Sequence, residues 1–220
     1  DVNCSYRKMH IAIAGNIGSG KTTLTQLLAK HYGWEPRYET VVNNPYIEDY
    51  YRNIPRWSFA MEVFYLKERF RDMLEIAKAK NTIIQDRSIF EGVYVFAANN
   101  HNMGYLDDRD FSTYMELFES IMMRVNYPRL LIYLRASLQH LVANIENRGR
   151  SFEQGMPIDY LENLNKLYDD FVLNKYPAPK LVIDVDNLDF QHNKRDLGRI
   201  VDQIDSELFG LFADSPSLSN

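Results

Sequence analysis

A glycine-rich segment at residues 15–22 constrains the fold of this 220-residue chain more than any other feature. It matches the pattern of a phosphate-binding loop: a glycine, any four residues, a second glycine, a lysine, and then a serine or threonine. A short apolar run precedes it at residues 10–14, and an amphipathic pattern follows it at residues 22–32. Because this loop joins a strand to a helix, the sequence predicts a βα unit near the start of the chain. The loop residues are Gly15, Asn16, Ile17, Gly18, Ser19, Gly20, Lys21 and Thr22.

The chemistry of this loop depends on its backbone and on its last two residues. Glycines allow the backbone N–H groups to point inward toward an anion, and the positive end of the following helix reinforces the site. Lys21 is expected to reach the outer phosphates, and the Thr22 hydroxyl is expected to bind Mg²⁺. The alternative is a glycine-rich turn without a ligand, which does not require lysine followed by threonine. The sequence therefore predicts a nucleotide phosphate site.

The rest of the chain alternates short apolar runs with longer helical patterns. This alternation predicts an α/β fold, in which helices cover a parallel sheet. The five expected strands are residues 10–14, 37–40, 82–85, 130–134 and 181–185. The expected helices are residues 22–32, 56–80, 88–99, 111–126, 137–148, 157–174 and 196–208, with a charged loop at residues 148–155.

Length and composition bound the class of protein. The length favours a single domain, for which we expect residues 9–212, preceded by an extension at residues 1–8 and followed by a flexible tail at residues 213–220. The net charge of −5 argues against a general nucleic-acid surface. The sequence contains no run of 18 consecutive apolar residues, so we expect no membrane partner. The single cysteine, Cys4, cannot form an internal disulfide bond, so we expect a cytoplasmic protein.

A phosphate loop alone leaves several functions open: a GTPase switch, an ATPase motor, a nucleoside or nucleotide kinase, or a regulatory nucleotide sensor. Residues 165–168 read Asn-Lys-Leu-Tyr and lack the aspartate of the guanine-binding signature, which disfavours a GTP switch. A small-molecule kinase needs a base beside the acceptor hydroxyl, an arginine near the transferred phosphoryl group and a mobile cationic loop. The chain has candidates for all three.

Two candidates follow predicted strands. Asp86 and Arg87 come directly after residues 82–85, at the carboxyl end of a strand, where open α/β sheets bind ligands. The alternative for Asp86 is a helix cap, although Ser88 suits that position as well. Glu39 also lies near a predicted strand end, and its alternative is a solvated carboxylate.

Charged residues on helices supply the remaining candidates. Arg148 and Arg150 flank Gly149 and form either a lid over triphosphate oxygens or the basic end of a helix. Glu62 and Arg69 lie seven positions apart on one face of the predicted helix 56–80. From the helix pattern alone, Glu62 and Arg69 are expected at a solvated edge, because charged residues are rarely buried without partners.

Taken together, these motifs resemble the deoxyribonucleoside kinases, the family that includes deoxycytidine, deoxyguanosine and bacterial deoxyadenosine kinases. The likeness runs from about Met9 to Phe212. It implies a P-loop kinase fold with a five-stranded parallel sheet, helices on both faces and a short arginine-rich lid. It also implies Mg²⁺-dependent transfer of the ATP γ-phosphate to the 5′-hydroxyl of a deoxyribonucleoside in nucleotide salvage, by a homodimer. The resemblance rests on residues 15–23, Glu39, residues 56–59, 85–88 and 148–155, and residues 184–190.

The resemblance also implies roles for individual residues. Glu39 is the general base that accepts the 5′-hydroxyl proton, Arg87 stabilises the developing phosphoryl charge together with Lys21, and Asp86 assists at Mg²⁺. Arg148 and Arg150 form the lid. The remaining implied ligands are Thr23 at the phosphates, Tyr51 and Glu153 at the sugar 3′-hydroxyl, Phe96 stacked on the base, and Asp189 with Phe190 around the donor adenine.

Three positions depart from the family pattern and bear on base preference. Glu62 replaces a glutamine that reads the base edge, Gly92 replaces an aspartate, and Asn144 replaces a lid arginine. An ionised carboxylate only accepts hydrogen bonds, so Glu62 suits the N1–H and amino groups of guanine, while Arg69 donates to O6 or N7. The expected substrate is therefore a purine deoxynucleoside, deoxyguanosine or deoxyadenosine, with guanine favoured over adenine and cytosine.

Two alternatives to this function remain at the level of sequence. A nucleoside monophosphate kinase of the thymidylate type also uses a phosphate loop, an Asp-Arg motif and an arginine lid. Its acceptor is already ionised and needs no base, so Glu39 favours a hydroxyl acceptor. A non-catalytic nucleotide-binding subunit has no use for a base beside the acceptor.

Overall fold

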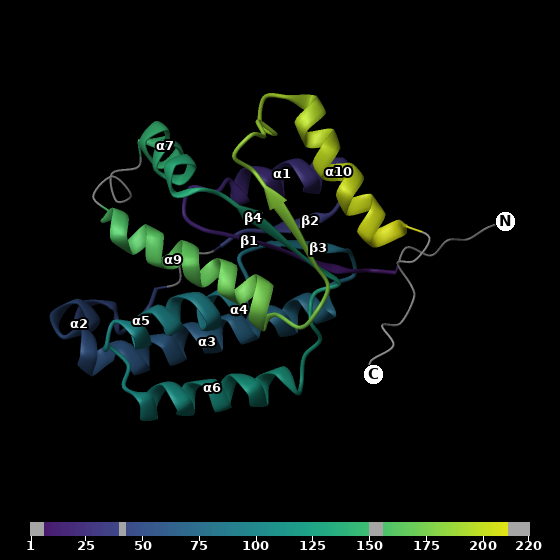
Figure 1. The fold of residues 1–220 in the computed structure, drawn as a ribbon. Coiled ribbons are helices and arrows are strands. Elements are labelled where there is room, and N and C mark those ends of the chain that lie inside the picture. The colour runs from purple at the N-terminus through teal and green to yellow at the C-terminus, as the bar shows by residue number, and fades with distance from the viewer. Residues whose placement is uncertain (1–6, 40–42, 150–155, 211–220) are drawn as a thin grey trace.

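The computed structural model describes residues 7–39, 43–149 and 156–210, and in it five strands form one parallel sheet in the order β2-β3-β1-β4-β5. Figure 1 shows this sheet at the centre of the molecule. The α/β class and the five-stranded sheet predicted from the sequence are confirmed. The strands are β1 (His10–Gly15), β2 (Glu35–Arg37), β3 (Ile83–Asp86), β4 (Leu130–Arg135) and β5 (Lys180–Asp184).

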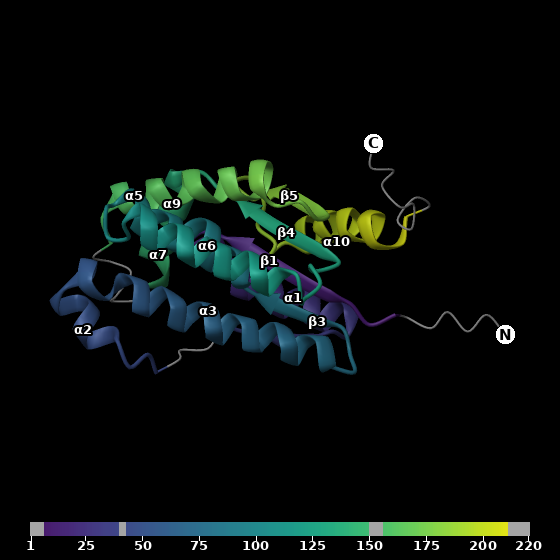
Figure 2. The ribbon, with the colours of Figure 1, turned by 90° about the horizontal axis from the view of Figure 1, so that it is seen from below.

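Helices cover both faces of the sheet. In Figure 1, α1 and α10 lie on one face, and α3, α6 and α9 lie on the other. Figure 2 shows the second layer from below, where α3 and α6 pack side by side. The helices are α1 (Lys21–Tyr32), α2 (Ile47–Arg52), α3 (Ile54–Lys78), α4 (Ile89–Glu91), α5 (Ala98–Asn102), α6 (Asp108–Met122), α7 (Leu138–Arg148), α9 (Ile158–Asp170) and α10 (Lys194–Phe209), with π-helical turns η1 (Gly92–Ala97) and η2 (Phe171–Lys175).

The alternation of side chains along β1 divides the apolar core into two. Ile11 and Ile13 pack with α1 and α10, whereas Ala12 and Ala14 pack with α3, α4 and α9. Successive side chains of a strand point to opposite faces, and a strand covered on both faces is apolar at every position. This explains why residues 10–14 read as a continuous apolar run and not as an alternating one.

The order of the strands places the phosphate loop at a ligand-binding crevice. From β1, the chain first builds β2 and β3 on one side of the sheet, and then β4 and β5 on the other. The carboxyl end of β1 is therefore the point at which the direction of winding reverses, and open α/β sheets bind ligands at such a point. In the described part of the chain, no helix is long and apolar enough to span a bilayer.

Several predicted boundaries are wrong. The strand expected at residues 37–40 is β2, which pairs Glu35, Pro36 and Arg37 with β3, so Glu39 follows the strand by two residues. Helix α2 is missing from the prediction, because its sequence is polar and too short to show a periodic pattern. The segment 88–99 is helical as predicted, with η1 inside it. Residues 213–220 and most of the extension 1–8 lie outside the described residues.

Candidate active site

The phosphate loop connects β1 to α1, and its lysine is buried. The exposed fraction of Lys21 is 8%, and its Nζ donates a hydrogen bond to the carbonyl oxygen of Asn16 at 3.3 Å. Burial lowers the pKa of Lys21 to about 8. A triphosphate bound at this loop would favour the charged form of the amine.

Residues from outside the loop hold its backbone in place. Nδ2 of Asn144, on α7, donates to the carbonyl oxygen of Gly18 at 2.8 Å. The ring of Phe190 lies against Gly20, so that a β-carbon built on Gly20 is 2.8 Å from Cζ of the ring. Asn144 therefore supports the loop at the position where the resemblance implies a lid arginine. Phe190 borders the loop, and the expected contact of Asp189 and Phe190 with the donor adenine stays a prediction.

Thr22 and Asp86 meet at the carboxyl ends of β1 and β3. Oγ1 of Thr22 donates to Oδ2 of Asp86 at 2.6 Å, and Asp86 is 3% exposed. Its other oxygen, Oδ1, is buried and makes no hydrogen bond with the described residues. Mg²⁺ is usually held by one or two carboxylates, waters and substrate phosphates, so this pair fits that ion. Among the described residues there is no cluster of three or more His, Cys, Asp or Glu side chains that fits a metal.

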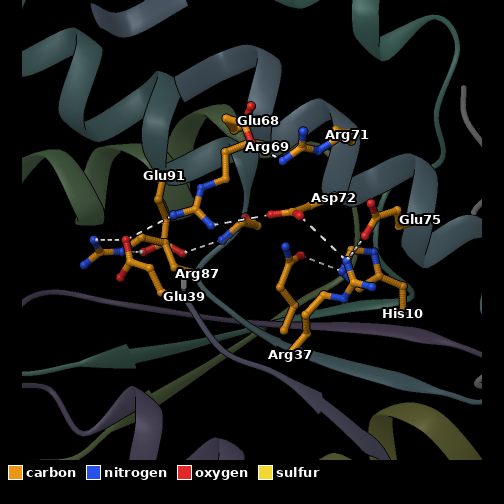
Figure 3. A network of polar contacts seen from close by, with 12 residues as sticks. His10, Arg37, Glu39, Glu68, Arg69, Arg71, Asp72, Glu75, Arg87 and Glu91 are labelled. Carbon is orange, nitrogen blue, oxygen red and sulfur yellow. Dashed lines mark hydrogen bonds and ion pairs between the residues drawn. The ribbon is translucent and has the colours of Figure 1, made fainter. Parts of the chain in front are cut away.

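Glu39 lies between two arginines from different elements, as Figure 3 shows. Its Oε1 accepts hydrogen bonds from Nη1 of Arg87 and from Nη2 of Arg69, each at 3.0 Å. Arg87 follows β3, and Arg69 lies on α3, where it also approaches Asp72 at 3.8 Å. The structure thus brings together Glu39 and Arg87, the base and the arginine predicted from the sequence, and adds Arg69 to them.

Arg87 is held in an unusual backbone conformation. Its φ is 65°, the one positive value among the described non-glycine residues, and such strain costs about 1–3 kcal/mol. Its guanidinium lies 4.8 Å from the ring centroid of Phe96, and its Nε is 3.7 Å from Oε2 of the fully buried Glu91. Burial lowers the pKa of Arg87, but surrounding groups, including Tyr168, Glu39 and Glu91, raise it above its ordinary value. The guanidinium is therefore charged and fixed in direction.

A cavity of about 490 Å³ opens beside Glu39 and Arg87. It is bounded by α2, α3, α9 and the helical segment that follows β3. The acceptor residues predicted from the sequence that fall in the described part of the chain all line it: Glu39, Tyr51, Glu62, Arg69, Arg87 and Phe96. Glu153 and Arg150 lie outside the described residues. Arg148 is exposed at the end of α7 and precedes Gly149, whose φ is 62°.

The environment of Glu62 differs from both sequence-based expectations. The helix pattern predicted a solvated edge, but Glu62 is only 6% exposed. Its Oε1 accepts a hydrogen bond from Nδ2 of Asn100 at 2.7 Å, and burial raises its pKa to about 8. This setting favours the neutral acid over the ionised carboxylate that the sequence analysis assumed. Arg69, for which a contact with the nucleobase is predicted, forms ion pairs with Glu39 and Asp72.

Several residues of the site escaped the sequence analysis. Glu91 lies four residues after Arg87, a spacing that places two side chains on one face of a helix and provides a local signal. Tyr168 donates to Oε2 of Glu91 from α9, 77 positions away, which no local pattern reveals. The cavity is also lined by Tyr50, Asn100 and Tyr160, which lie on helices far apart in the sequence, so no local pattern reveals them either.

Comparison with known proteins agrees with this site. Residues 11–209 match the family model described as deoxynucleoside kinase. The chain is 35% identical over 198 residues to a deoxyadenosine/deoxycytidine kinase of Bacillus subtilis, covering 89% of this chain and 91% of the relative. It is 32% identical over 215 residues to a deoxyguanosine kinase of Lactobacillus johnsonii, covering 93% of this chain and 95% of the relative.

Solved structures give the same result. A deoxyadenosine kinase from M. mycoides with bound dATP superposes with a TM-score of 0.74 at 32% identity, covering 90% of this chain and 100% of that chain. The same enzyme with products dCMP and a flexible dCDP superposes with a TM-score of 0.75. Neither the thymidylate-kinase type nor a non-catalytic subunit is favoured by these matches. A phosphate loop, a carboxylate held by two arginines and relatives of this similarity together show that the chain belongs to the deoxynucleoside kinase family.

Proposed function

We propose that this kinase transfers the γ-phosphate of ATP to the 5′-hydroxyl of a purine deoxynucleoside, with Glu39 as the general base. One observation carries the proposal: Glu39 and Arg87 are bonded to each other at the rim of the acceptor cavity. Arg87 directly follows Asp86, which the phosphate loop contacts through Thr22. The acceptor cavity and the phosphate cradle therefore meet at one point, as phosphoryl transfer requires.

The reaction assigns a task to each of these side chains. The 5′-oxygen attacks the γ-phosphorus, the bond to the bridging oxygen of ADP breaks, and the hydroxyl proton passes to Glu39. Both arginines bond to Oε1 of Glu39, and Oε2 makes no hydrogen bond with a described residue, so Oε2 is the atom that accepts the proton. Arg87 and Lys21 are the cations proposed to stabilise the negative charge of the transferred group.

Mg²⁺ is the proposed cofactor, held by Thr22 and Asp86. The ion neutralises charge on the β- and γ-phosphates when it is bound. The unbonded, buried Oδ1 of Asp86 supports this assignment, because a buried carboxylate oxygen without a partner is costly. The remaining donor-side ligands proposed are the backbone of residues 15–23, the lid arginines Arg148 and Arg150, and Asp189 with Phe190.

The proposed acceptor contacts follow the lining of the cavity. Phe96 presents a ring for the base, while Tyr51 and Glu153 are proposed at the sugar 3′-hydroxyl. The purine assignment is supported by relatives named deoxyadenosine kinase and deoxyguanosine kinase, while the name of the Bacillus subtilis relative also includes deoxycytidine. The single cysteine favours a reducing compartment such as the cytoplasm.

We also propose a homodimer that uses the outer face of α6. Leu117 and Met123, at this helix and its C-cap, are 41% and 79% exposed, whereas Tyr114 and Phe118 face the core. Light scattering tests the assembly. A dimer that dissociates when Leu117 is replaced by lysine supports this face, and a monomeric wild-type chain overturns it.

The direct test of function is ADP release from Mg-ATP with a panel of acceptors. The panel contains the four deoxynucleosides, the corresponding ribonucleosides and their 5′-monophosphates. Turnover with deoxyadenosine or deoxyguanosine, and its loss on chelation of Mg²⁺, is the expected result. Turnover with monophosphates alone would assign the chain to another kinase class, and ATP binding without any turnover would indicate a non-catalytic protein.

A further inference from the structure

The wall of the acceptor cavity away from the phosphate loop contains a carboxyl group in an apolar and neutral setting. Glu62, on α3, is 6% exposed and lines the cavity. Three tyrosines from other helices lie near it: Tyr50 on α2, Tyr114 on α6 and Tyr160 on α9. Each is a phenol whose pKa is raised by burial, to about 12 for Tyr50. None of these groups is charged near neutral pH.

No cation compensates Glu62 in the described part of the chain. The two arginines that line the same cavity, Arg69 and Arg87, both bond to Glu39. Glu62 makes no ion pair with any described residue, and its one hydrogen bond comes from the neutral amide of Asn100. An ionised carboxylate that is buried without a cation is costly, so such a group holds its proton. Burial accordingly raises the pKa of Glu62 to about 8.

The contact with Asn100 decides which oxygen of Glu62 carries that proton. Nδ2 of Asn100 is an amide nitrogen that donates and does not accept, so Oε1 of Glu62 is the carbonyl-type oxygen. The proton is then on Oε2, which has no hydrogen-bond partner among the described residues. The carboxyl group of Glu62 therefore presents an O–H donor beside a C=O acceptor to the cavity. A glutamine amide has the same arrangement of one donor beside one acceptor.

We propose that Glu62, oriented by Asn100, reads the base as a neutral carboxylic acid and selects bases that carry an amino group next to a ring-nitrogen acceptor. Adenine and cytosine have this edge, whereas guanine presents an N1–H donor that opposes the O–H of Glu62. Among purines, the site thus selects adenine, the reverse of the preference that an ionised Glu62 implies. The proposal rests on the proposed function, since it concerns the acceptor base of that reaction. Asn100 is a positioning residue that acts through Glu62.

The test is the ratio of kcat/KM for deoxyadenosine to kcat/KM for deoxyguanosine, measured from about pH 6 to about pH 9. Titration of Lys21 or of ATP affects the turnover of both substrates, so its effect cancels in the ratio. The ratio is expected to be high and constant at low pH, and to fall up to about tenfold per pH unit once Glu62 ionises. A ratio that favours deoxyguanosine at low pH, or that does not change with pH, would overturn the proposal.

Two variants separate this role from a structural one. In Glu62→Gln, the amide reproduces the neutral acid, so the preference for deoxyadenosine is expected to persist while its pH dependence disappears. The hydrogen bond from Asn100 lowers the pKa of Glu62. Asn100→Leu removes this bond, so the pKa of Glu62 is expected to rise and the midpoint of the ratio to move to higher pH. A merely structural Asn100 would reduce both activities and leave the midpoint unchanged.

A matched control lies on the same helix. Glu68 is also 6% exposed, but Lys67 and Arg71 pair with it. Because its charge is compensated, Glu68→Gln is expected to keep the pH profile of the ratio seen in the wild-type protein. If Glu68→Gln removes the pH dependence as Glu62→Gln does, Glu62 is not the titrating group and the proposal fails.

Binding of deoxyadenosine and deoxyguanosine without ATP, measured by calorimetry at both ends of the pH range, keeps the two proposals distinguishable. Turnover with an unchanging ratio would uphold the kinase function and overturn the role of Glu62. Absence of turnover, combined with pH-dependent selection of deoxyadenosine in binding, would overturn the kinase function and uphold the role of Glu62.

Discussion

Nη1 of Arg87 donates a hydrogen bond to Oε1 of Glu39 at 3.0 Å, and this contact joins residues 48 positions apart. Arg87 follows β3, and Glu39 follows the neighbouring edge strand β2. The parallel pairing of β2 with β3 therefore places the two groups together at the carboxyl edge of the sheet (Figure 3). Two arginines hold this carboxylate without any substrate, so a general base at this position would need no reorganisation.

Replacement of Glu39 by glutamine is expected to lower kcat by about 10²–10⁴-fold, because the amide cannot accept the hydroxyl proton. The size of the side chain is preserved, so the KM for the deoxynucleoside is expected to change far less. Steady-state kinetics with saturating Mg-ATP measures both constants. An unchanged kcat would show that Glu39 is not the base.

Tyr168 is expected to control the direction of Arg87 through Glu91. Tyr168→Phe removes the hydroxyl that donates to the buried Glu91, which leaves part of that carboxylate unsatisfied at a cost of about 1–3 kcal/mol. Because Glu91 lies beside Nε of Arg87, kcat is expected to fall as well. Urea unfolding and steady-state kinetics measure the two effects.

Tyr133→Phe is the matched control for this change. Tyr133 is 1% exposed, stacks on Tyr168 at 6.1 Å, and donates to Asp169. Its loss is expected to affect stability without a comparable loss of kcat, because Asp169 does not contact Arg87. Equal losses of kcat in both variants would contradict the positioning role.

Gly20 is expected to tolerate no side chain. Its φ is 94°, and a β-carbon would lie 2.8 Å from the ring of Phe190, so Gly20→Ala displaces either the phosphate loop or that ring. We expect a raised KM for ATP. Gly33→Ala provides a control, since its φ is 69° but no atom lies within 4 Å of the added carbon. That change is expected to cost about 1–2 kcal/mol of stability and to leave the KM for ATP unchanged.

His10 is expected to make folding sensitive to acid. Its Nε2 hydrogen-bonds with Gln85 at 2.9 Å, and burial lowers its pKa from 6.5 to about 4. Between these values the unfolded chain binds a proton that the folded chain excludes. The free energy of unfolding is therefore expected to fall by up to about 1.4 kcal/mol per pH unit as the pH drops from 6.5 toward 4.

A comparison of variants isolates this contribution. His10→Gln removes the titrating ring, so its free energy of unfolding is expected to depend less on pH over this range. His31→Gln changes an exposed histidine on α1 and is expected to behave as the wild-type protein does. Denaturant unfolding at several pH values gives the three curves. Parallel curves for His10→Gln and the wild-type protein would contradict the assignment.

The errors of the sequence analysis have a common physical origin. The edge strand β2 contains Pro36, which an edge tolerates, so its extent is set by pairing with β3 and not by an apolar pattern. The helix pattern predicts a solvated Glu62 because charged residues are rarely buried without partners, yet the packing of α2, α6 and α9 around it removes water. Neither the partner of a strand nor the burial of one side chain is a local property.

By itself, the sequence determined the α/β class, the phosphate loop, the position of Asp86 and Arg87 at the carboxyl end of a strand, and the family. These features depend on residues that are neighbours in the chain, where spacing alone sets backbone geometry and periodicity. Only the tertiary structure decided that Glu39 meets two arginines, that Tyr168 supports Glu91, and that Glu62 is buried beside Asn100. Charge state and hydrogen-bond partners depend on burial and on segments distant in sequence, which come together only when the helices pack on the sheet.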